Sequence, residues 1–311
     1  MEKISVIVPC YNEEGSLPLF YERAAALADK MLDSGVEFEF IFTDDGSKDR
    51  TADILRELCL KDQRVRFVSF SRNFGKEAAM YAGFQAARGD YAVSVDADLQ
   101  HPPELIEEMY NFIKTEGWDC VAARRTDRRG EPLLKRLFSA AFYKLINAVS
   151  ETKLVSGACD FRLMKRRMLD AVLSISEKNR FSKGIFDWVG FRTKWISFEN
   201  VKRAAGTSKW SFFKLLKYSL EGILSFSTAI LSLPLILGAA SLIAALILGI
   251  VMLCTHNGGT VPSVWLAALV IGGINLVATG TLAAYLKKSY TEIKNRPIYL
   301  VRETDEDVRG K

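Results

Sequence analysis

Two aspartates that follow a short apolar run carry the clearest chemical signal in the chain. The run from Tyr91 to Val95 is rich in β-branched and aromatic residues and lies between Gly-Asp and Pro-Pro, which predicts a buried strand. Asp96 and Asp98 follow it two positions apart, so an extended backbone would point both carboxylates the same way. Two hard oxygen ligands in this arrangement suit Mg2+ or Mn2+ carrying a diphosphate. The alternative is a pair of acids in a solvated turn.

The surrounding elements would place this acid pair at the edge of a sheet. Apolar runs predict strands at 4–8, 38–42, 65–70 and 91–95, and helical patterns separate them. Such alternation predicts an α/β fold with a doubly wound, mostly parallel sheet, which binds its ligands at the carboxyl ends of the strands. The first strand-to-helix turn has no G-x-G-x-x-G, which excludes a dinucleotide-binding crossover.

Four motifs occur in order within the first 105 residues: VIVPCYNEE, TDDGSKDRT, SRNFGKEAAMYAGFQAARGD and DADLQHPPE. Together they resemble the family 2 inverting glycosyltransferases of the GT-A fold. The resemblance implies a nucleotide-sugar donor, a bound divalent metal ion and a catalytic role for Asp98. The donor-binding residues that it implies are Pro9, Tyr11, Glu13, Asp44, Asp45, Asp96 and Gln100. The metal ligands that it implies are Asp96, Asp98 and Gln100.

Structural roles are the alternative for several of these residues. Asp44 and Asp45 also suit an Asx turn that caps the next helix, and Tyr11 suits a packing aromatic. We favour donor or metal contact for Asp44 and Asp98. For His101 we favour a simple loop position before the next helix.

A second group of segments resembles the polyprenyl-phosphate branch of this family, to which dolichol-phosphate mannose synthase is similar. Residues 157–164, GACDFRLM, resemble the segment that carries an acceptor-side aspartate, which makes Asp160 a catalytic-site residue contacting the sugar or the acceptor. Whether Asp160 acts as a base or only positions the substrate stays open, because a phosphate monoester with a second pKa of about 6 is already largely ionised at neutral pH. The alternative for Asp160 is a helix N-cap for the residues from Phe161 onward.

Basic residues cluster in two places that suit an acceptor phosphate. The run from Arg124 to Arg136 follows a predicted strand, which favours an anion-binding loop over the site, although a solvated loop is the alternative. Residues 202–210, KRAAGTSKW, resemble the basic acceptor-phosphate loop of the same branch. On that match Arg203 and Lys209 would bind the lipid phosphate, with Arg124 nearby.

The last third of the chain predicts membrane attachment. Residues 229–255 and 256–286 contain no Asp, Glu, Lys or Arg, and each stretch can span about 30 Å of hydrocarbon as a helix. Basic residues precede and follow the pair, so both termini should be cytoplasmic. The expected organisation is a catalytic domain over 1–201, a basic loop and amphipathic juxtamembrane helix over 202–228, a two-helix hairpin over 229–286 and a cytoplasmic tail over 287–311. The alternatives are a buried hairpin in a soluble protein and an amphipathic helix packed on the catalytic domain.

Composition argues against several other functional classes of protein. The five cysteines are scattered without a C-x-x-C and the chain has two histidines, which argues against a zinc site or a disulfide framework and agrees with a reducing cytoplasm. The net charge is +5 with no basic array interleaved with aromatics, so we expect no nucleic-acid partner. A homo-oligomer is left open.

These observations predict a multi-pass enzyme of the inner or plasma membrane. The resemblance implies that it would transfer a hexose, with glucose from UDP-glucose favoured, to undecaprenyl or another polyprenyl phosphate at the cytoplasmic face, with inversion. The alternatives are N-acetylglucosamine, mannose or aminoarabinose as the sugar, a diacylglycerol or protein acceptor, and a catalytically silent sugar-nucleotide-binding membrane subunit. A processive polysaccharide synthase is excluded because the only glutamines are Gln63, Gln85 and Gln100, so the chain has no Q-x-x-R-W after residue 160.

Overall fold

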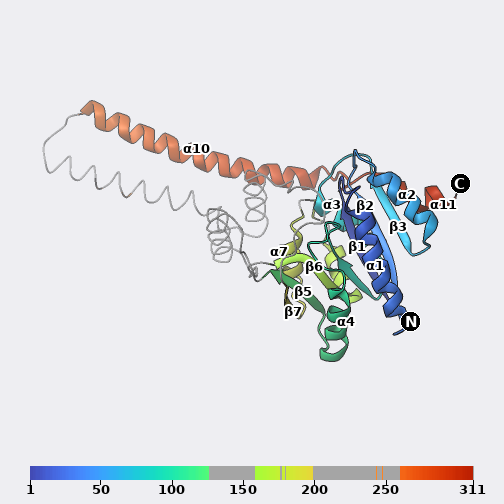
Figure 1. The fold of residues 1–311 in the computed structure, drawn as a ribbon. Coiled ribbons are helices and arrows are strands. Elements are labelled where there is room, and N and C mark those ends of the chain that lie inside the picture. Colours follow the sequence, from blue (N-terminus) through green and yellow to red (C-terminus); the bar gives the residue numbers. More distant parts are fainter. Residues whose placement is uncertain are drawn as a thin grey trace.

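The computed structural model of the 311-residue chain describes residues 1–125, 158–175, 177–178, 180–198, 243, 247 and 260–310 (Figure 1). Several predicted segments lie outside the described residues. They are most of the basic run that begins at Arg124, the basic loop with Arg203 and Lys209, the amphipathic juxtamembrane helix, and nearly all of the first predicted membrane helix.

An eight-stranded sheet forms the centre of the described structure, in the order β7-β5-β6-β4-β1-β2-β3-β8. Parallel pairs join β1 to β2, β1 to β4, β2 to β3 and β5 to β7, whereas β6 is antiparallel to β4 and β5, and β8 is antiparallel to β3. The α/β class is therefore confirmed, and the sheet is mixed. The strands are β1 (Glu2–Cys10), β2 (Val36–Asp44), β3 (Val65–Phe70), β4 (Tyr91–Ser94), β5 (Cys120–Arg125), β6 (Ala158–Lys165), β7 (Thr193–Phe198) and β8 (Val301–Thr304).

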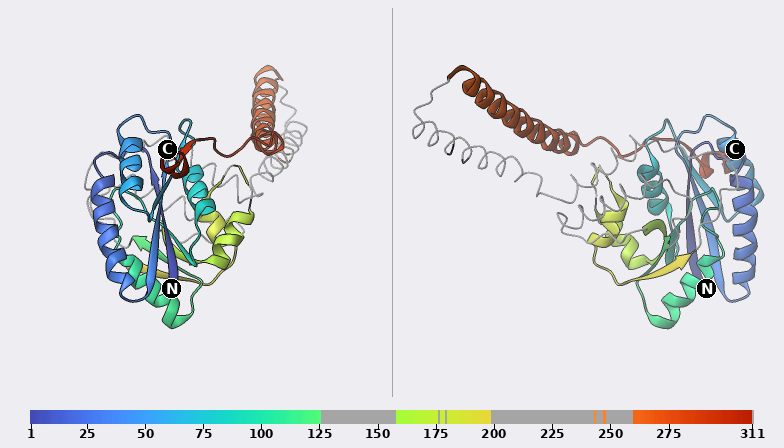
Figure 2. Two further views of the ribbon diagram at one scale, coloured as in Figure 1. Left: turned by 90° about the vertical axis from the view of Figure 1, so that its right-hand side faces the viewer. Right: turned by 60° about the vertical axis from the view of Figure 1, so that its left-hand side comes forward.

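Helices cover both faces of this sheet (Figure 2). The described helices are α1 (Leu17–Leu32), α2 (Thr51–Lys61), α3 (Lys76–Ala86), α4 (Leu105–Glu116), α6 (Arg166–Ser174), α7 (Ser182–Trp188), α10 (Thr260–Ile293) and α11 (Asp305–Arg309). Alternate residues of β1 point to opposite faces of the sheet. Val6 and Val8 pack in the core cluster that contains α1, α2 and α4. Ile7 packs in the cluster that contains α3, α6 and α7. Burial on both faces explains why the central strands are continuously apolar rather than alternating.

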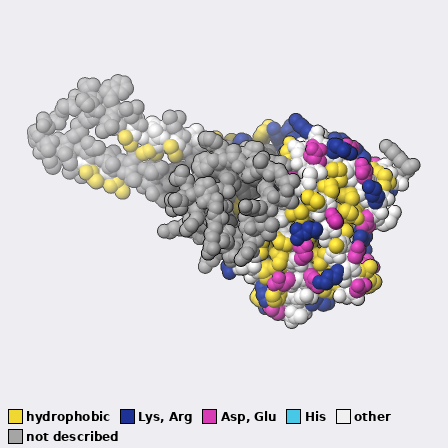
Figure 3. All heavy atoms as spheres, in the orientation of Figure 1, with side chains coloured by type: hydrophobic (Ala, Val, Ile, Leu, Met, Phe, Trp, Pro, Cys, Tyr) yellow, Lys and Arg dark blue, Asp and Glu magenta, His cyan; other side chains and the backbone are white. Residues whose placement is uncertain are grey.

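The helix α10 extends away from the sheet (Figure 1) and contains most of the second predicted membrane helix. Its segment Val270–Lys287 has a mean hydropathy of 1.3 and none of it is buried, and within the described residues it is the one helix long and apolar enough to cross a membrane. Figure 3 shows apolar side chains on this helix, whereas acidic and basic side chains are interspersed over the visible face of the sheet domain. After α10 the chain returns to the sheet as β8 and α11, which the sequence did not predict.

Packing of α3 on β1 generates a stability prediction at Gly83. A Cβ atom at this position would lie 2.3 Å from Ile7 Cγ2, so the helix approaches the strand too closely for any larger residue. We expect Gly83→Ala to lower the free energy of unfolding by about 1–3 kcal/mol, measured by thermal unfolding in detergent. Ile7→Ala removes the opposing methyl group, so the double variant should lose less stability than the sum of the single variants. Strict additivity would contradict this close packing.

Candidate active site

The sheet brings the predicted acid residues to one edge. The parallel strands β1, β2 and β4 end together there, with Cys10 paired to Asp44 and Ile7 paired to Ser94. Because β6 is antiparallel to β4, its beginning lies at the same edge, and Ser94 pairs with Arg162. The loop after β4 and the start of β6 therefore meet. Residues that are about 60 positions apart in the sequence become neighbours in this way.

A lysine ammonium joins the two strands at this edge. Lys76, the first residue of α3, places Nζ 2.7 Å from Asp96 Oδ1 and 2.8 Å from Asp160 Oδ2. Burial alone would raise the pKa of both carboxyls. The charge and hydrogen bonds of Lys76, together with other nearby positive charges, outweigh it and hold the pKa of Asp96 and Asp160 below the usual range. Burial would likewise lower the pKa of Lys76, yet the two carboxylates raise it. The sequence did not single out Lys76, although its place directly after Gly75 at a helix start was a usable signal.

Asp160 lies in strand β6, so the helix N-cap alternative is wrong. Its second oxygen, Oδ1, is buried and accepts no hydrogen bond from the described residues. After Lys76, the positive charges of Lys183 and Arg162 also lower the pKa of this carboxyl. The Arg162 guanidinium is itself 1% exposed and lies 3.9 Å from the ring centre of Phe186. Asp160 therefore lies among positive charges, and one of its carboxylate oxygens can still accept a hydrogen bond.

Asp98 and the residues after it form a tight turn. Asp98 is buried and its Oδ1 accepts a hydrogen bond of 3.1 Å from the Gln100 N–H. Gln100 itself remains partly exposed. His101 is buried beside Phe161 and Phe198, with ring centroids 5.4 and 5.2 Å away. His101 thus has a packing role within the loop that leads into α4.

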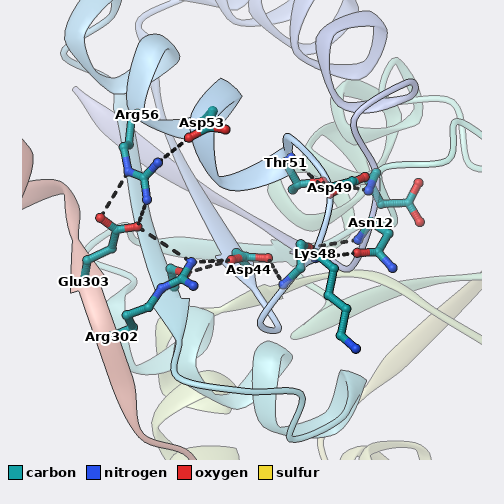
Figure 4. A network of polar contacts seen from close by, with 12 residues as sticks. Asn12, Asp44, Lys48, Asp49, Thr51, Asp53, Arg56, Arg302 and Glu303 are labelled. Atoms are coloured by element: carbon teal, nitrogen blue, oxygen red, sulfur yellow. Dashed lines mark hydrogen bonds and ion pairs between the residues drawn. The ribbon is translucent and has the colours of Figure 1, made fainter.

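The loops after β1 and β2 are fastened to each other by hydrogen bonds (Figure 4). Asn12 N–H donates to Ser47 Oγ at 2.9 Å, and Lys48 N–H donates to Asn12 Oδ1 at 2.8 Å. Glu13 N–H donates to Thr51 Oγ1 at 2.8 Å. These contacts hold the predicted donor residues Pro9, Tyr11 and Glu13 at the sheet edge, where each is partly exposed. The sequence singled out neither Asn12 nor Thr51, because their partners lie in another loop.

The two aspartates at the end of β2 face different partners. Asp44 is fully buried, and its carboxylate accepts from Ser47 N–H at 2.9 Å and from the Ser69 hydroxyl at 2.7 Å. The first of these contacts closes an Asx-type turn, but α2 begins at Thr51, so Asp44 does not cap that helix as the alternative supposed. Asp45 instead accepts from the N–H groups of Phe74 and Gly75, at 2.6 and 2.9 Å. Asp45 thereby anchors the loop that begins α3 and carries Lys76.

Of the basic residues assigned to the acceptor phosphate, the structure describes Arg124. It is exposed near the end of β5, and its Nε donates to Ser197 Oγ on β7 at 3.4 Å. Arg203 and Lys209 lie outside the described residues.

The donor set is suited to a divalent cation that shares its coordination with a substrate. No three acidic, histidine or cysteine side chains among the described residues converge as a complete metal cage. Mg2+ in particular is commonly held by one or two carboxylates together with substrate phosphates, which Asp96 and Asp98 can satisfy. The buried Oδ1 of Asp160, which accepts no hydrogen bond from the described residues, is a further oxygen at the same edge. The residues present therefore fit Mg2+ or Mn2+ bound with a diphosphate.

Comparisons with known proteins place the chain among glycosyltransferase sequences. The family model described as "Glycosyl transferase family 2" matches residues 5–173. The chain is 41% identical over 309 residues to the putative glycosyltransferase CsbB of Bacillus subtilis, covering 97% of this chain and 92% of that protein. It is 37% identical over 313 residues to an SfII prophage-derived bactoprenol glucosyl transferase of Shigella flexneri, covering 97% and 98%. A solved structure, glucosyl-3-phosphoglycerate synthase from Mycobacterium tuberculosis, matches 72% of this chain and 77% of its own at 22% identity with a TM-score of 0.44.

Asp45 makes stability depend on pH. Burial raises the pKa of Asp45 from 3.8 to about 6. The two backbone N–H donors lower this pKa, but their effect is smaller than that of burial. Between these values the folded state keeps a proton that the unfolded chain has released, so stability should fall as the pH rises from 3.8 to about 6. Asp45→Asn cannot ionise and should flatten this part of the profile of thermal midpoint against pH. An identical slope in the variant would contradict the shifted pKa.

The ion pairs of Lys76 lead to a second prediction, which concerns the stability of the fold. Lys76→Met leaves two neighbouring carboxylates without their shared cation, so we expect the free energy of unfolding to fall by about 1–3 kcal/mol, since the group is partly exposed. Lys76→Arg keeps the charge and should lose less. Adding Asp160→Asn to Lys76→Met should recover part of the loss, because one unpaired charge is removed. Thermal unfolding of the four proteins measures this, and no recovery in the double variant would contradict the ion-pair assignment.

Proposed function

The chain belongs to glycosyl transferase family 2, and we propose that it transfers glucose from UDP-glucose to a polyprenyl phosphate at the cytoplasmic face of a membrane. The observation that carries this proposal is the joint placement of Asp96 and Asp160, from the donor and acceptor sides of the site, around one lysine ammonium. The bactoprenol glucosyl transferase name of a relative that covers nearly the whole chain supports both glucose and the lipid phosphate. That name favours glucose over N-acetylglucosamine, mannose or aminoarabinose.

The donor would bind along the carboxyl ends of β1, β2 and β4. Asp44 would face the nucleoside, together with Pro9 near the end of β1 and with Tyr11 and Glu13 from the loop after it. The residues that would hold the cation are Asp96, Asp98 and Gln100. When bound, Mg2+ or Mn2+ supplies positive charge that stabilises the departing diphosphate. Lys76 then has a separate task, because it keeps Asp96 and Asp160 ionised and close together.

Asp160 would position the substrate rather than remove a proton. Its pKa is held low by the Lys76 ammonium, which makes its carboxylate a weak base. A polyprenyl phosphate needs no general base, since its oxygen is already negative at neutral pH. In the reaction a phosphate oxygen forms a bond to the anomeric carbon while the bond from that carbon to UDP breaks, and the electron pair leaves on UDP. Attack opposite to the leaving group inverts the anomeric centre.

The sheet supports the proposed membrane topology. Strand β3 precedes α10 in the chain and β8 follows it, yet the two pair directly in one sheet. A sheet in water cannot have strands on both sides of a bilayer, so if α10 crosses the membrane the segment 199–259 must cross it as well. This supports a two-helix hairpin with the catalytic domain and both termini on the cytoplasmic side. The exposed apolar side chains of α10, among them Leu282 and Leu286, suit contact with lipid.

A product assay tests the proposed function. Membranes that contain the protein are incubated with undecaprenyl phosphate and, in separate reactions, radiolabelled UDP-glucose, UDP-N-acetylglucosamine, GDP-mannose and UDP-aminoarabinose. We expect label in the lipid fraction from UDP-glucose, and mild acid should release it as glucose. Transfer from another donor would overturn the sugar assignment. No lipid labelling from any donor would overturn the proposed function.

Asp98 provides the matched variant for this assay. Asp98→Ala removes a proposed ligand of the cation, and we expect the transfer rate to fall by at least about 100-fold while the thermal midpoint stays within a few degrees of the wild type. Asp170→Ala is the control, because Asp170 is an exposed acid on α6 whose recorded ion pair is with Arg166. Mn2+ binding with UDP, followed by electron paramagnetic resonance, should be weakened by the first variant alone. Wild-type transfer by Asp98→Ala would contradict the assignment.

A further inference from the structure

The end of the chain adds a strand to the sheet that carries the site. After α10, β8 pairs antiparallel with the edge strand β3, with Val68 opposite Thr304 and Ser69 opposite Glu303. The contact begins before the strand, because Ser71 N–H donates to Leu300 O at 3.0 Å. The chain thus leaves the long apolar helix and covers a sheet edge that would otherwise expose its hydrogen-bonding groups.

Three charged side chains hold the segment from β8 to the end of α11, which we call the tail, in one position. Glu303 forms two hydrogen bonds with Arg56 of α2, at 3.1 and 2.5 Å. Asp305 is buried and accepts from Phe67 N–H at 3.3 Å. The Arg309 guanidinium donates to four backbone carbonyls between the end of α2 and the start of β3. Because these contacts use both the backbone and charged side chains, β8 has a fixed register rather than a loose association.

That register places Arg302 beside the proposed nucleoside pocket (Figure 4). Arg302 Nη2 donates to Ser69 Oγ at 2.9 Å and lies 3.7 Å from Asp44 Oδ2. Ser69 in turn donates to the same Asp44 oxygen at 2.7 Å. The side chain of Arg302 is 44% exposed whereas that of Asp44 is 0% exposed, so a partly exposed cation is paired with a fully buried carboxylate.

The contact between Arg302 and Asp44 compensates the charge of a buried carboxylate. A buried carboxylate is costly unless charge and hydrogen bonds compensate it, and Arg302 is the cation within ion-pair distance of Asp44 among the described residues. Because the Ser69 oxygen accepts from Arg302, the Ser69 hydroxyl proton is committed to Asp44. Ser47 N–H fixes the other oxygen. Arg302 therefore sets both the charge balance and the orientation of the Asp44 side chain.

We propose that Arg302 is a positioning residue of the donor site, supplied by the part of the chain that follows the apolar helix α10. The inference rests on the proposed function, because that function assigns Asp44 to the nucleoside of the donor. It follows that the nucleoside pocket is complete only when β8 is paired with β3. Donor binding is thereby coupled to the docking of the tail, and through it to the placement of α10.

The test measures UDP affinity of the full-length protein in detergent by isothermal titration calorimetry. We expect Arg302→Met to raise the Kd for UDP by roughly ten- to hundredfold, the usual effect of losing a hydrogen bond to a charged group. Arg302→Lys should recover part of that affinity. In the transfer assay the donor KM should rise with little change in the acceptor KM. Ser69→Ala breaks the same chain of contacts from β3 and should also weaken UDP binding, which keeps the test valid if Arg302→Met folds poorly.

Arg56→Gln is the matched control. It removes one recorded partner of Glu303, which also lies 3.8 Å from Arg302. The pairing of β8 with β3 and the contacts of Arg309 still dock the tail, so the Arg302 contact with Asp44 stays in place. We expect wild-type UDP affinity from this variant. Equal affinity of Arg302→Met and wild type for UDP would overturn the inference, as would an equal loss in Arg56→Gln and Arg302→Met. If the wild type binds no UDP, the proposed function fails and this inference fails with it.

Discussion

The concentration of negative charge where β4 ends is the constraint on which the site depends. Asp96 follows β4 and Asp160 lies in β6, which runs in the opposite direction, and the two carboxylates would repel each other without a cation between them. Lys76 supplies that cation, and Asp45 holds in place the loop that delivers it. The carboxylates on which the proposed donor and acceptor functions rely are thus organised by the protein itself. A metal ion would join this arrangement with the diphosphate of its substrate rather than create it.

A second constraint comes from the two ends of the chain meeting in one sheet. The strands β1 to β7 precede the long apolar helix, and β8 follows it, so a catalytic domain on one side of a bilayer must receive the chain back on the same side. Besides pairing with the edge strand β3, the segment that contains β8 contributes a side chain to the proposed site. It brings Arg302 to Asp44, and this links the proposed nucleoside pocket to the position of the long apolar helix α10. Anchoring and donor recognition would then share one structural element.

Most of the central sheet could be predicted from the sequence, whereas the turn that carries Asp98 after β4 and the contacts between distant segments could not. Tyr91 to Val95 and its neighbours are strongly apolar, so strand positions and the placement of Asp96 follow from local pattern. The pairing of Lys76 with Asp160 spans 84 residues and has no local signal. The strand β8 has four residues, VRET, which carry no apolar alternation, so its pairing is visible only in three dimensions. The proposed roles of Arg203 and Lys209 remain predictions from the sequence.

The most direct measurement is a titration of the wild-type protein with Mn2+, followed by electron paramagnetic resonance, in the absence and presence of saturating UDP. Because the Lys76 ammonium already compensates part of the charge of Asp96 and Asp160, the ion alone should bind weakly, and the diphosphate should raise its affinity at least about tenfold by adding ligands and charge. Equal Mn2+ affinity with and without UDP would contradict a site in which protein carboxylates and substrate phosphates hold the cation together.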